Sequence, residues 1–209
     1  MSTRLVGTLV AVVLVAGLAA AAFRGSDGGG AGPDAERIAA AADLVAESQT
    51  ARMRFRAAGV SGEGVVDVVT GAGQFVVDGV LLVSDGRRIY VVDEDGTRTE
   101  QADAGGDVGS SAYLDLLRGA PAGEVERIGD RQYRVIVDVG EAAAAAPARS
   151  RPTLAALQRL SSRLELQVIL DGAGYPVRLV VRLPVGDVVV ELWDFGIELP
   201  EIARSEGGG

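Results

Sequence analysis

The stretch RLELQVILDGAGYPVRLVVRLPVGDVVVELW, residues 163–193, determines the architecture of this chain. Apolar and polar side chains alternate along its three segments, which are separated by the short turns DGAG and PVG. In the first segment the apolar side chains from Leu164 to Leu170 share one face, and Arg163 and Glu165 lie on the other. Alternation with a period of two is typical of strands in an antiparallel sheet that has one buried and one solvated face. The stretch therefore predicts three consecutive antiparallel strands joined by tight turns.

The same pattern continues upstream and predicts a large sheet. We expect further strands at 53–58, 64–70, 74–78, 81–84, 88–93 and 132–139. Asp85-Gly86 and Asp95-Gly96 are hairpin signals between them. Because twist accumulates across strands, an open sheet of eight or more strands curls. We therefore predict an α+β fold built on a curved antiparallel half-barrel sheet.

Three helices are expected to lie on the concave face of this sheet. The first begins at Asp34, a good N-cap residue, and runs to about Arg52. The second covers 110–119, with a serine at its start and Gly119 at its end. The third covers 153–161, where leucines recur at helical spacing. The alanine-rich segment 141–151 is interpreted as a loop.

The N-terminal segment Leu5–Phe23 contains no charged residue. Nineteen helical residues at about 1.5 Å each span roughly 28 Å, close to the hydrocarbon core of a bilayer at about 30 Å. A retained membrane anchor is the favoured interpretation, because the apolar region of a cleaved signal is shorter. The small residues Ala19–Ala22 also fit a signal cleavage site, so a cleaved signal stays an alternative. The charged flanks disfavour a buried core helix, and Arg4 favours an internal N-terminus with the domain outside.

Composition excludes several classes of chemistry. The chain contains no cysteine and no histidine and carries a net charge of −9. Ser-His and Cys-His catalytic pairs, cysteine or histidine zinc sites and disulfides are therefore impossible within it. The acidic charge makes nucleic acid a poor partner, and Asp93–Gly96 lacks the spacing of a calcium loop. We predict no enzyme, no catalytic residue, no metal site and no cofactor.

Four segments resemble a known family. They are MRFRAAG at 53–59 after an alanine-rich helix, SAYLDLLRGA at 111–120, ERIGDRQYRVIVDV at 126–139 and VVVELWDFGIELPEI at 188–202. Their order resembles the LolA-like fold and, more closely, the actinobacterial LppX/LprG-type lipoproteins. That family carries a lipobox cysteine after its signal, whereas this chain has no cysteine. Attachment through a lipidated cysteine is therefore excluded, and a retained transmembrane helix is the expected substitute.

The resemblance implies that an acyl chain binds between the sheet and the helices. A broad valine-rich sheet with few helices favours such a cavity, although a completely filled core stays the alternative. The predicted wall of the cavity consists of Val66, Val68, Phe75, Val77, Tyr113, Leu117, Val135, Val137, Leu166, Val168, Leu179, Val181 and Val190. The predicted division is an anchor or signal at 1–24, a flexible tether at 25–33, a LolA/LppX-like lipid-binding domain at 34–203 and a disordered tail at 204–209.

These expectations combine into two hypotheses of function. The first is an extracytoplasmic carrier for an acylated lipid or lipoprotein, held at the cell membrane by a single N-terminal pass, or secreted if the segment is cleaved. The second is an extracytoplasmic sensory or regulatory domain that binds a protein partner of the cell envelope. Trp193 and Phe195 are interpreted as local packing of the C-terminal tail on the sheet, with an exposed contact to a membrane or partner as the alternative.

Overall fold

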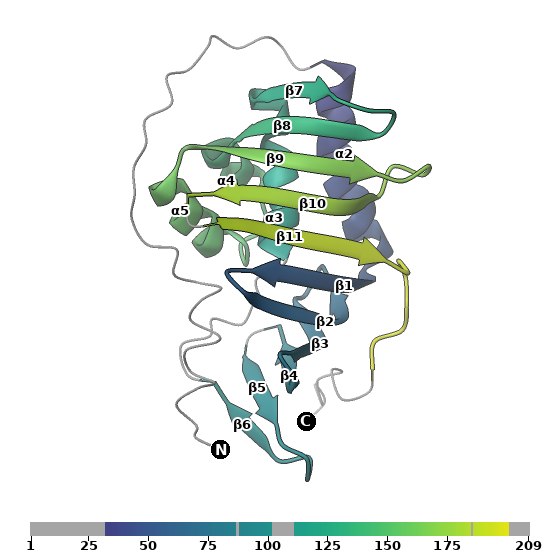
Figure 1. Cartoon of the computed structure of the whole chain (residues 1–209), viewed down its shortest axis with the longest axis vertical. Coiled ribbons are helices and arrows are strands. Elements are labelled where there is room, and N and C mark those ends of the chain that lie inside the picture. The colour runs from purple at the N-terminus through teal and green to yellow at the C-terminus, as the bar shows by residue number, and fades with distance from the viewer. Residues whose placement is uncertain (1–31, 87, 102–110, 185, 201–209) are drawn as a thin grey trace.

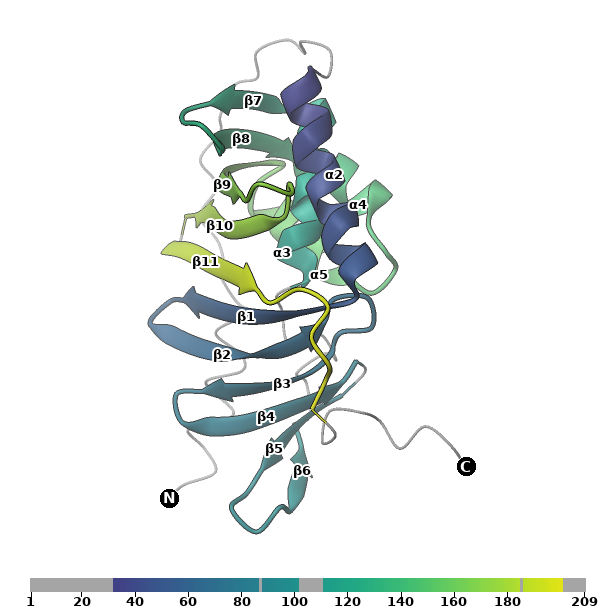
Figure 2. The ribbon, with the colours of Figure 1, turned by 90° about the vertical axis from the view of Figure 1, so that its right-hand side faces the viewer.

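A computed structural model of the chain describes residues 32–86, 88–101, 111–184 and 186–200. These residues form an α+β fold in which one large antiparallel sheet carries helices on one face (Figure 1, Figure 2). The predicted anchor, most of the predicted tether and the predicted tail lie outside the described residues. Within the described ranges, no helix combines the length and the apolar character needed to cross a bilayer.

The sheet consists, in the described residues, of eleven strands in the order β6-β5-β4-β3-β2-β1-β11-β10-β9-β8-β7. Their bounds are β1 Thr50–Ala57, β2 Val60–Asp67, β3 Ala72–Val77, β4 Val80–Asp85, β5 Ile89–Val92, β6 Arg98–Glu100, β7 Glu124–Arg127, β8 Gln132–Asp138, β9 Arg163–Leu170, β10 Pro176–Leu183 and β11 Gly186–Trp193. Two meanders therefore meet where β1 pairs with β11, and Phe55 lies opposite Val190 at that seam. The predicted antiparallel sheet is confirmed.

Tight turns set the register of the first meander. Ala58 and Gly59, which join β1 to β2, both have positive φ angles, 49° and 83°. This conformation is that of a two-residue turn whose twist matches the twist of paired strands. The predicted hairpin at Asp95-Gly96 joins β5 to β6, and the backbone N–H of Thr97 donates to the Asp95 carboxylate. This hydrogen bond lowers the pKa of Asp95.

The helices differ from the expectation in number and bounds. Among the described residues they are α2 Pro33–Ser48, α3 Ser111–Asp115, the 3₁₀-helix η1 Leu116–Ala122, α4 Val139–Ala145 and α5 Arg151–Leu160. The prediction of three helices was therefore wrong, because α4 occupies much of the alanine-rich segment interpreted as a loop. The side chain of Asp138 caps α4 by accepting from the backbone N–H of Glu141 at 2.9 Å. Alanine has the highest helix propensity, so a capped alanine run is sufficient for a short helix.

The first helix also begins and ends earlier than expected. Its N-cap is Gly32 rather than Asp34, and Asp34 instead pairs with Arg37 within the first turn at 3.7 Å. The helix ends at Ser48 because Gln49 has a positive φ of 64°, which an α-helix does not allow. This turn lets β1 begin at Thr50 and places α2 across the sheet.

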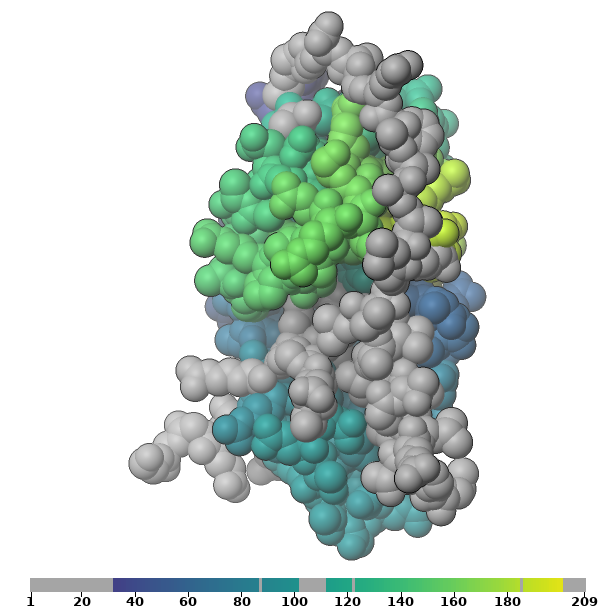
Figure 3. Space-filling view, turned by 90° about the vertical axis from the view of Figure 1, so that its left-hand side faces the viewer, coloured from purple at the N-terminus to yellow at the C-terminus, as the bar shows by residue number. Residues whose placement is uncertain are grey.

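The helices cover one part of the apolar face. The first helix contacts β1, β7 and β10, and η1 contacts β7 and β8. Figure 2 shows α2–α5 beside β7–β11 and β1, and no helix of the described residues beside β3–β6. In Figure 3 the green atoms of α4 and α5 form the upper part of this side, and teal atoms of the β4–β6 region form its lower end. The helical cover is therefore shorter than the sheet.

The opposite face of the sheet carries a row of ion pairs from β7 to β2. Glu165 on β9 pairs with Arg134 on β8 and with Arg182 on β10, at 2.8 and 3.4 Å. Farther along, Glu191 on β11 pairs with Arg178 at 2.9 Å and with Arg54 at 3.7 Å. Opposite charges on neighbouring strands stabilise a sheet modestly, and they keep this face solvated. The predicted division into one apolar and one polar face is therefore observed.

Candidate ligand-binding site

The predicted wall residues share the helix-covered side of the molecule. Those on strands lie on neighbouring positions of one face: Val135 lies opposite Leu166, and Leu166 lies opposite Val181. Three are not on strands: Val68 lies in the turn after β2, Tyr113 in α3 and Leu117 in η1. All thirteen are buried and belong to one hydrophobic cluster. Their contact with a ligand stays a prediction.

Helix side chains pack against much of this face. Ile38, Leu116 and Leu154, from three different helices, are fully buried in the same cluster as the strand valines. The sheet between β7 and β1 therefore has a packed core under the helices. On β3 to β5, Phe75, Leu82 and Ile89 belong to the same cluster, and Figure 2 shows no helix of the described residues beside these strands.

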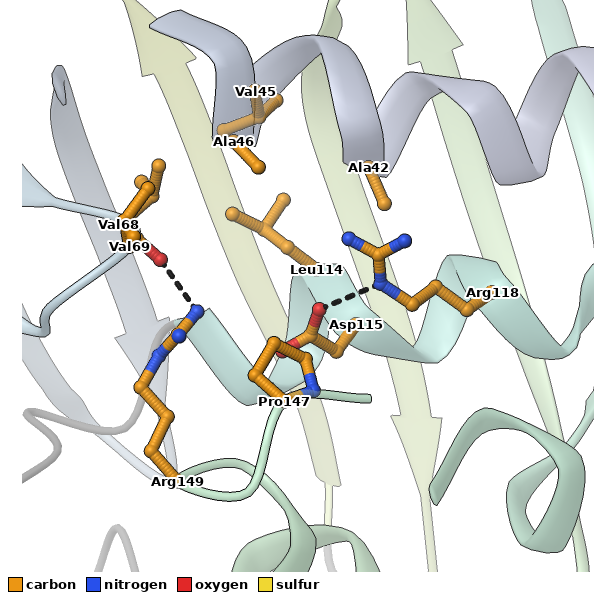
Figure 4. Close-up of a pocket in the computed structure, with 10 residues that line it drawn as sticks. All are labelled: Ala42, Val45, Ala46, Val68, Val69, Leu114, Asp115, Arg118, Pro147 and Arg149. Carbon is orange, nitrogen blue, oxygen red and sulfur yellow. Dashed lines mark hydrogen bonds and ion pairs between the residues drawn. The ribbon is translucent and has the colours of Figure 1, made fainter. Parts of the chain in front are cut away.

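A pocket lies at the end of the helix layer, close to the strands that have no described helix beside them (Figure 4). Its volume is about 80 Å³. The lining residues come from α2, the turn after β2, α3, η1 and the connection between α4 and α5: Ala42, Val45, Ala46, Val68, Val69, Leu114, Asp115, Arg118, Pro147 and Arg149. Since one water needs roughly 10–15 Å³ of such space, the pocket accommodates several water-sized groups. Of the thirteen predicted wall residues, Val68 alone borders this pocket.

A carboxylate forms the polar floor of the pocket. Asp115 is only 5% exposed. It accepts hydrogen bonds from the Ser150 hydroxyl at 2.6 Å and from Arg118 Nε at 3.0 Å. Arg118 also pairs with Asp43 on α2. Burial acts to lower the pKa of Arg118, but the hydrogen bonds and charges of Asp43 and Asp115 outweigh it and raise that pKa.

A second guanidinium lines the opposite side of the pocket. Arg149 Nη2 donates a 2.7 Å hydrogen bond to the main-chain oxygen of Val68 (Figure 4). Its Nε is buried and has no hydrogen-bond partner. The pocket thus combines apolar walls from α2 and the turn after β2 with one carboxylate and two guanidinium groups.

Sequence reasoning did not identify the polar part of this site. Asp115 interrupts an otherwise apolar helix in SAYLDLLRGA, and a carboxylate there was the available signal. Arg149 lies in the PARSR segment, which has no regular pattern. Its approach to Val68, 81 positions earlier in the chain, depends on the tertiary fold.

Among the described residues, no group of three or more acidic side chains lies close enough to hold a metal ion. Asp115 and Arg118 bond to each other and to Ser150 and Asp43, whereas Arg149 makes a single hydrogen bond, to the main chain. The chemistry of the pocket suits a ligand that has an apolar part and hydrogen-bond acceptors.

The two C-terminal aromatic residues pack locally. Phe195 stacks on Tyr175 with ring centroids 4.3 Å apart. The guanidinium of Arg54 lies 5.5 Å from the centre of the Trp193 ring. The main-chain N–H of Gly196 donates to the carbonyl of Thr50, which holds the tail beside β1. The stacking of Phe195 confirms packing of the tail on the sheet, whereas for the partly exposed Trp193 a contact with a membrane or partner stays an alternative.

Comparison with known proteins identifies the fold. No protein-family model and no curated protein sequence matches the chain. Among solved structures, LprF from Mycobacterium bovis matches with a TM-score of 0.52 and 14% identity, over 84% of this chain and 100% of LprF. The lipoprotein LppX from Mycobacterium tuberculosis matches with a TM-score of 0.51 and 17% identity, over 81% of this chain and 99% of LppX. At this identity the likeness is one of fold, and it confirms the expected LppX-like architecture.

Proposed function

We propose that this chain, on the fold it shares with LprF and LppX, is a binding or carrier protein for an acylated lipid or lipoprotein. The acyl chain would enter at the pocket beside α2 and Val68 and extend along the apolar face of β2 to β5. No chemical conversion of the ligand is part of this proposal.

The main support for the proposal is that the described helices cover only part of the apolar face of the sheet. The buried apolar cluster includes Phe75, Leu82 and Ile89 on β3 to β5, the strands that have no described helix beside them in Figure 2. The pocket opens at the boundary, between Val45 on α2 and Val68 after β2.

The pocket is too small for a long acyl chain, so binding of such a chain requires part of the protein to move. About 80 Å³ holds the end of an acyl chain and not a chain of sixteen carbons. Phe75 and Val77 are buried in this structure, so a longer ligand reaches them only if the segments packed against them move. Burying a sixteen-carbon chain contributes on the order of 10 kcal/mol before entropic costs. That amount offsets several kcal/mol of lost packing, so ligand binding and opening are energetically compatible.

The proposed location is the outer side of the cell membrane. The uncharged segment 5–23 is long enough to span the hydrocarbon core and would hold the domain there through the glycine-rich residues after it. Cell fractionation combined with protease accessibility tests this part of the proposal. A chain that stays in the membrane fraction and is digested from outside supports it, and a chain recovered in the cytosol overturns it.

Equilibrium binding tests the proposed ligand class. The full-length chain is titrated with a fluorescent sixteen-carbon fatty acid, and unlabelled palmitoylglycerol is used as a competitor. Saturable binding at one site per chain, displaced by the competitor, is the expected result. Binding that does not saturate, or that a sixteen-carbon chain cannot displace, would contradict the proposal. A chain truncated before Pro33 serves as a control for lipid held only by the N-terminal apolar segment.

A further inference from the structure

The position of Arg149 suggests what the polar end of the ligand is. Among the described arginines that form no ion pair, Arg56, Arg127, Arg151 and Arg159 are exposed, whereas Arg149 is half-buried. A guanidinium removed from water without a carboxylate partner is unusual, because burying an unpaired charge is costly. The cost falls when an anion is bound beside it.

The hydrogen-bonding capacity of Arg149 is mostly unused. A guanidinium has five N–H donors. The structure gives Arg149 one acceptor, the main-chain oxygen of Val68, and leaves its buried Nε without any. The other guanidinium in the pocket differs, because Arg118 is engaged by both Asp43 and Asp115. The available positive charge of the pocket therefore lies on Arg149.

The residues that line the pocket indicate which chemical groups the rest of the ligand contains. Of the ten lining residues, only Asp115, Arg118 and Arg149 are charged, and Asp115 and Arg118 pair with each other, so Arg149 is the lining charge that forms no ion pair. The remaining residues are alanine, valine, leucine and proline. Apolar walls next to one uncompensated guanidinium suit an acyl chain that ends in an anionic oxygen group.

We infer that Arg149 binds the anionic headgroup of an acyl ligand, a carboxylate or a phosphate, whose hydrocarbon part enters between α2 and β2. This inference rests on the proposed function and specifies its ligand. A carboxylate or phosphate oxygen accepts charge-assisted hydrogen bonds from a guanidinium, which are about twice as strong as bonds between neutral groups. A neutral acyl ester gains no such bond and is expected to bind more weakly.

A matched control residue lies two positions away. Arg151 donates from Nε to the main-chain oxygen of Ala146 at 3.2 Å, so it too bonds to a backbone carbonyl. It is exposed and does not line the pocket. Replacing Arg151 therefore removes the same charge and a similar hydrogen bond without changing the proposed headgroup site.

Equilibrium binding of three radiolabelled probes to the full-length chain tests the inference. The probes are palmitate, 1-palmitoyl-lysophosphatidate and the uncharged 1-palmitoylglycerol. Arg149→Gln is expected to weaken one or both anionic probes about tenfold or more and to leave palmitoylglycerol within about twofold. Arg149→Lys keeps the charge and is expected to restore most of the affinity, and Arg151→Gln is expected to have no effect. The anionic probe that responds identifies the carboxylate or the phosphate as the group bound.

The outcomes separate this inference from the proposed function. If the wild type binds all three probes and Arg149→Gln weakens none of them, or all of them equally, the headgroup site is wrong while lipid binding stands. If the wild type binds no probe, both fail. If Arg149→Gln does not fold, the salt dependence of binding to the wild type tests the inference instead. Raising the ionic strength is expected to lower the affinity for the anionic probes more than the affinity for palmitoylglycerol. An equal change in affinity for all three probes would overturn the inference.

Discussion

The hydroxyl of Ser150 donates a 2.6 Å hydrogen bond to Oδ2 of Asp115, and both residues are buried. The bond ties the connection between α4 and α5 to α3, two segments that both line the pocket. Asp115 also accepts from Arg118, whose side chain is 18% exposed. The polar floor of the pocket is thus a small network with its hydrogen bonds made inside the protein.

Removing the carboxylate should therefore destabilise the fold. Asp115→Ala leaves the Ser150 hydroxyl and Arg118 Nε without their acceptor, and we expect a loss of about 2–4 kcal/mol in the free energy of unfolding. Ser150→Ala removes one bond and should cost about 1–2 kcal/mol. Urea denaturation measures both. The exposed Asp130 provides the control, since Asp130→Ala should change stability by less than about 0.5 kcal/mol; equal losses in the two aspartate variants would refute the network.

The ion pairs of the solvated face predict a pH effect. The hydrogen bond and charge of Arg134 lower the pKa of Glu165 despite its partial burial. A folded pKa below the unfolded value, which is about 4.3 for glutamate, stabilises the protein above that value. This contribution is lost as the pH falls through the folded pKa. Glu165→Gln should therefore destabilise the protein by about 0.5–1 kcal/mol at pH 7 and by almost nothing near pH 3.

Thermal unfolding between pH 3 and pH 7 measures this difference. Glu94→Gln, in the exposed turn between β5 and β6, is the control and should show no comparable dependence. A Glu165→Gln difference that stays constant across the range would show that the pair contributes nothing through ionisation.

Close packing of the backbone makes Gly64 on β2 sensitive to substitution. A Cβ atom at this position would overlap the main-chain oxygen of Gln74 on the neighbouring strand β3. Gly64→Ala should therefore force the strands apart and cost about 1–3 kcal/mol. At Gly172, by contrast, the nearest atom to an added Cβ is the end of the Arg131 side chain at 3.2 Å, which can move. Chemical denaturation of Gly64→Ala and Gly172→Ala compares them, and similar stabilities would contradict the close approach.

Filling the pocket should block the ligand without unfolding the protein. Ala46 lines the pocket from α2, so Ala46→Trp places an indole in the space proposed for the acyl chain. We expect the affinity for a fluorescent fatty acid to fall about tenfold or more. Ala40 is exposed on the same helix, so Ala40→Trp makes the same change in a position that faces solvent. If the two tryptophan variants bind the probe equally well, the pocket is not part of the binding site.

Much of the fold could be predicted from the sequence because side chains alternate with a period of two. That signal placed the strands from Arg163 to Trp193 and the face that carries Leu166 and Val168. The edge strands β6 and β7 escaped prediction because their residues are mostly exposed and lack alternation. The helix α4 escaped because its alanine run resembles a low-complexity loop, and its cap at Asp138 was not recognised.

The candidate site was less predictable than the fold. Asp115, Arg118 and Arg149 acquire their roles from partners far away in the chain, such as Asp43 and Val68. No local pattern links residues separated by such distances. The one-sided apolar face was predictable from sequence, but the length of sheet that the helices leave uncovered depends on where α2 lies, which only the structure gives.

The most direct test of lipid binding on this face is a map of covalent labelling. The full-length chain is loaded with a sixteen-carbon fatty acid that carries a photoreactive diazirine in its chain, irradiated and analysed by peptide mass spectrometry. We predict labels on residues of α2, α3 and the apolar face of β2 to β5, and less labelling in Ala46→Trp than in Ala40→Trp. Labels confined to the N-terminal segment 5–23 or to the charged face of the sheet would contradict the proposal.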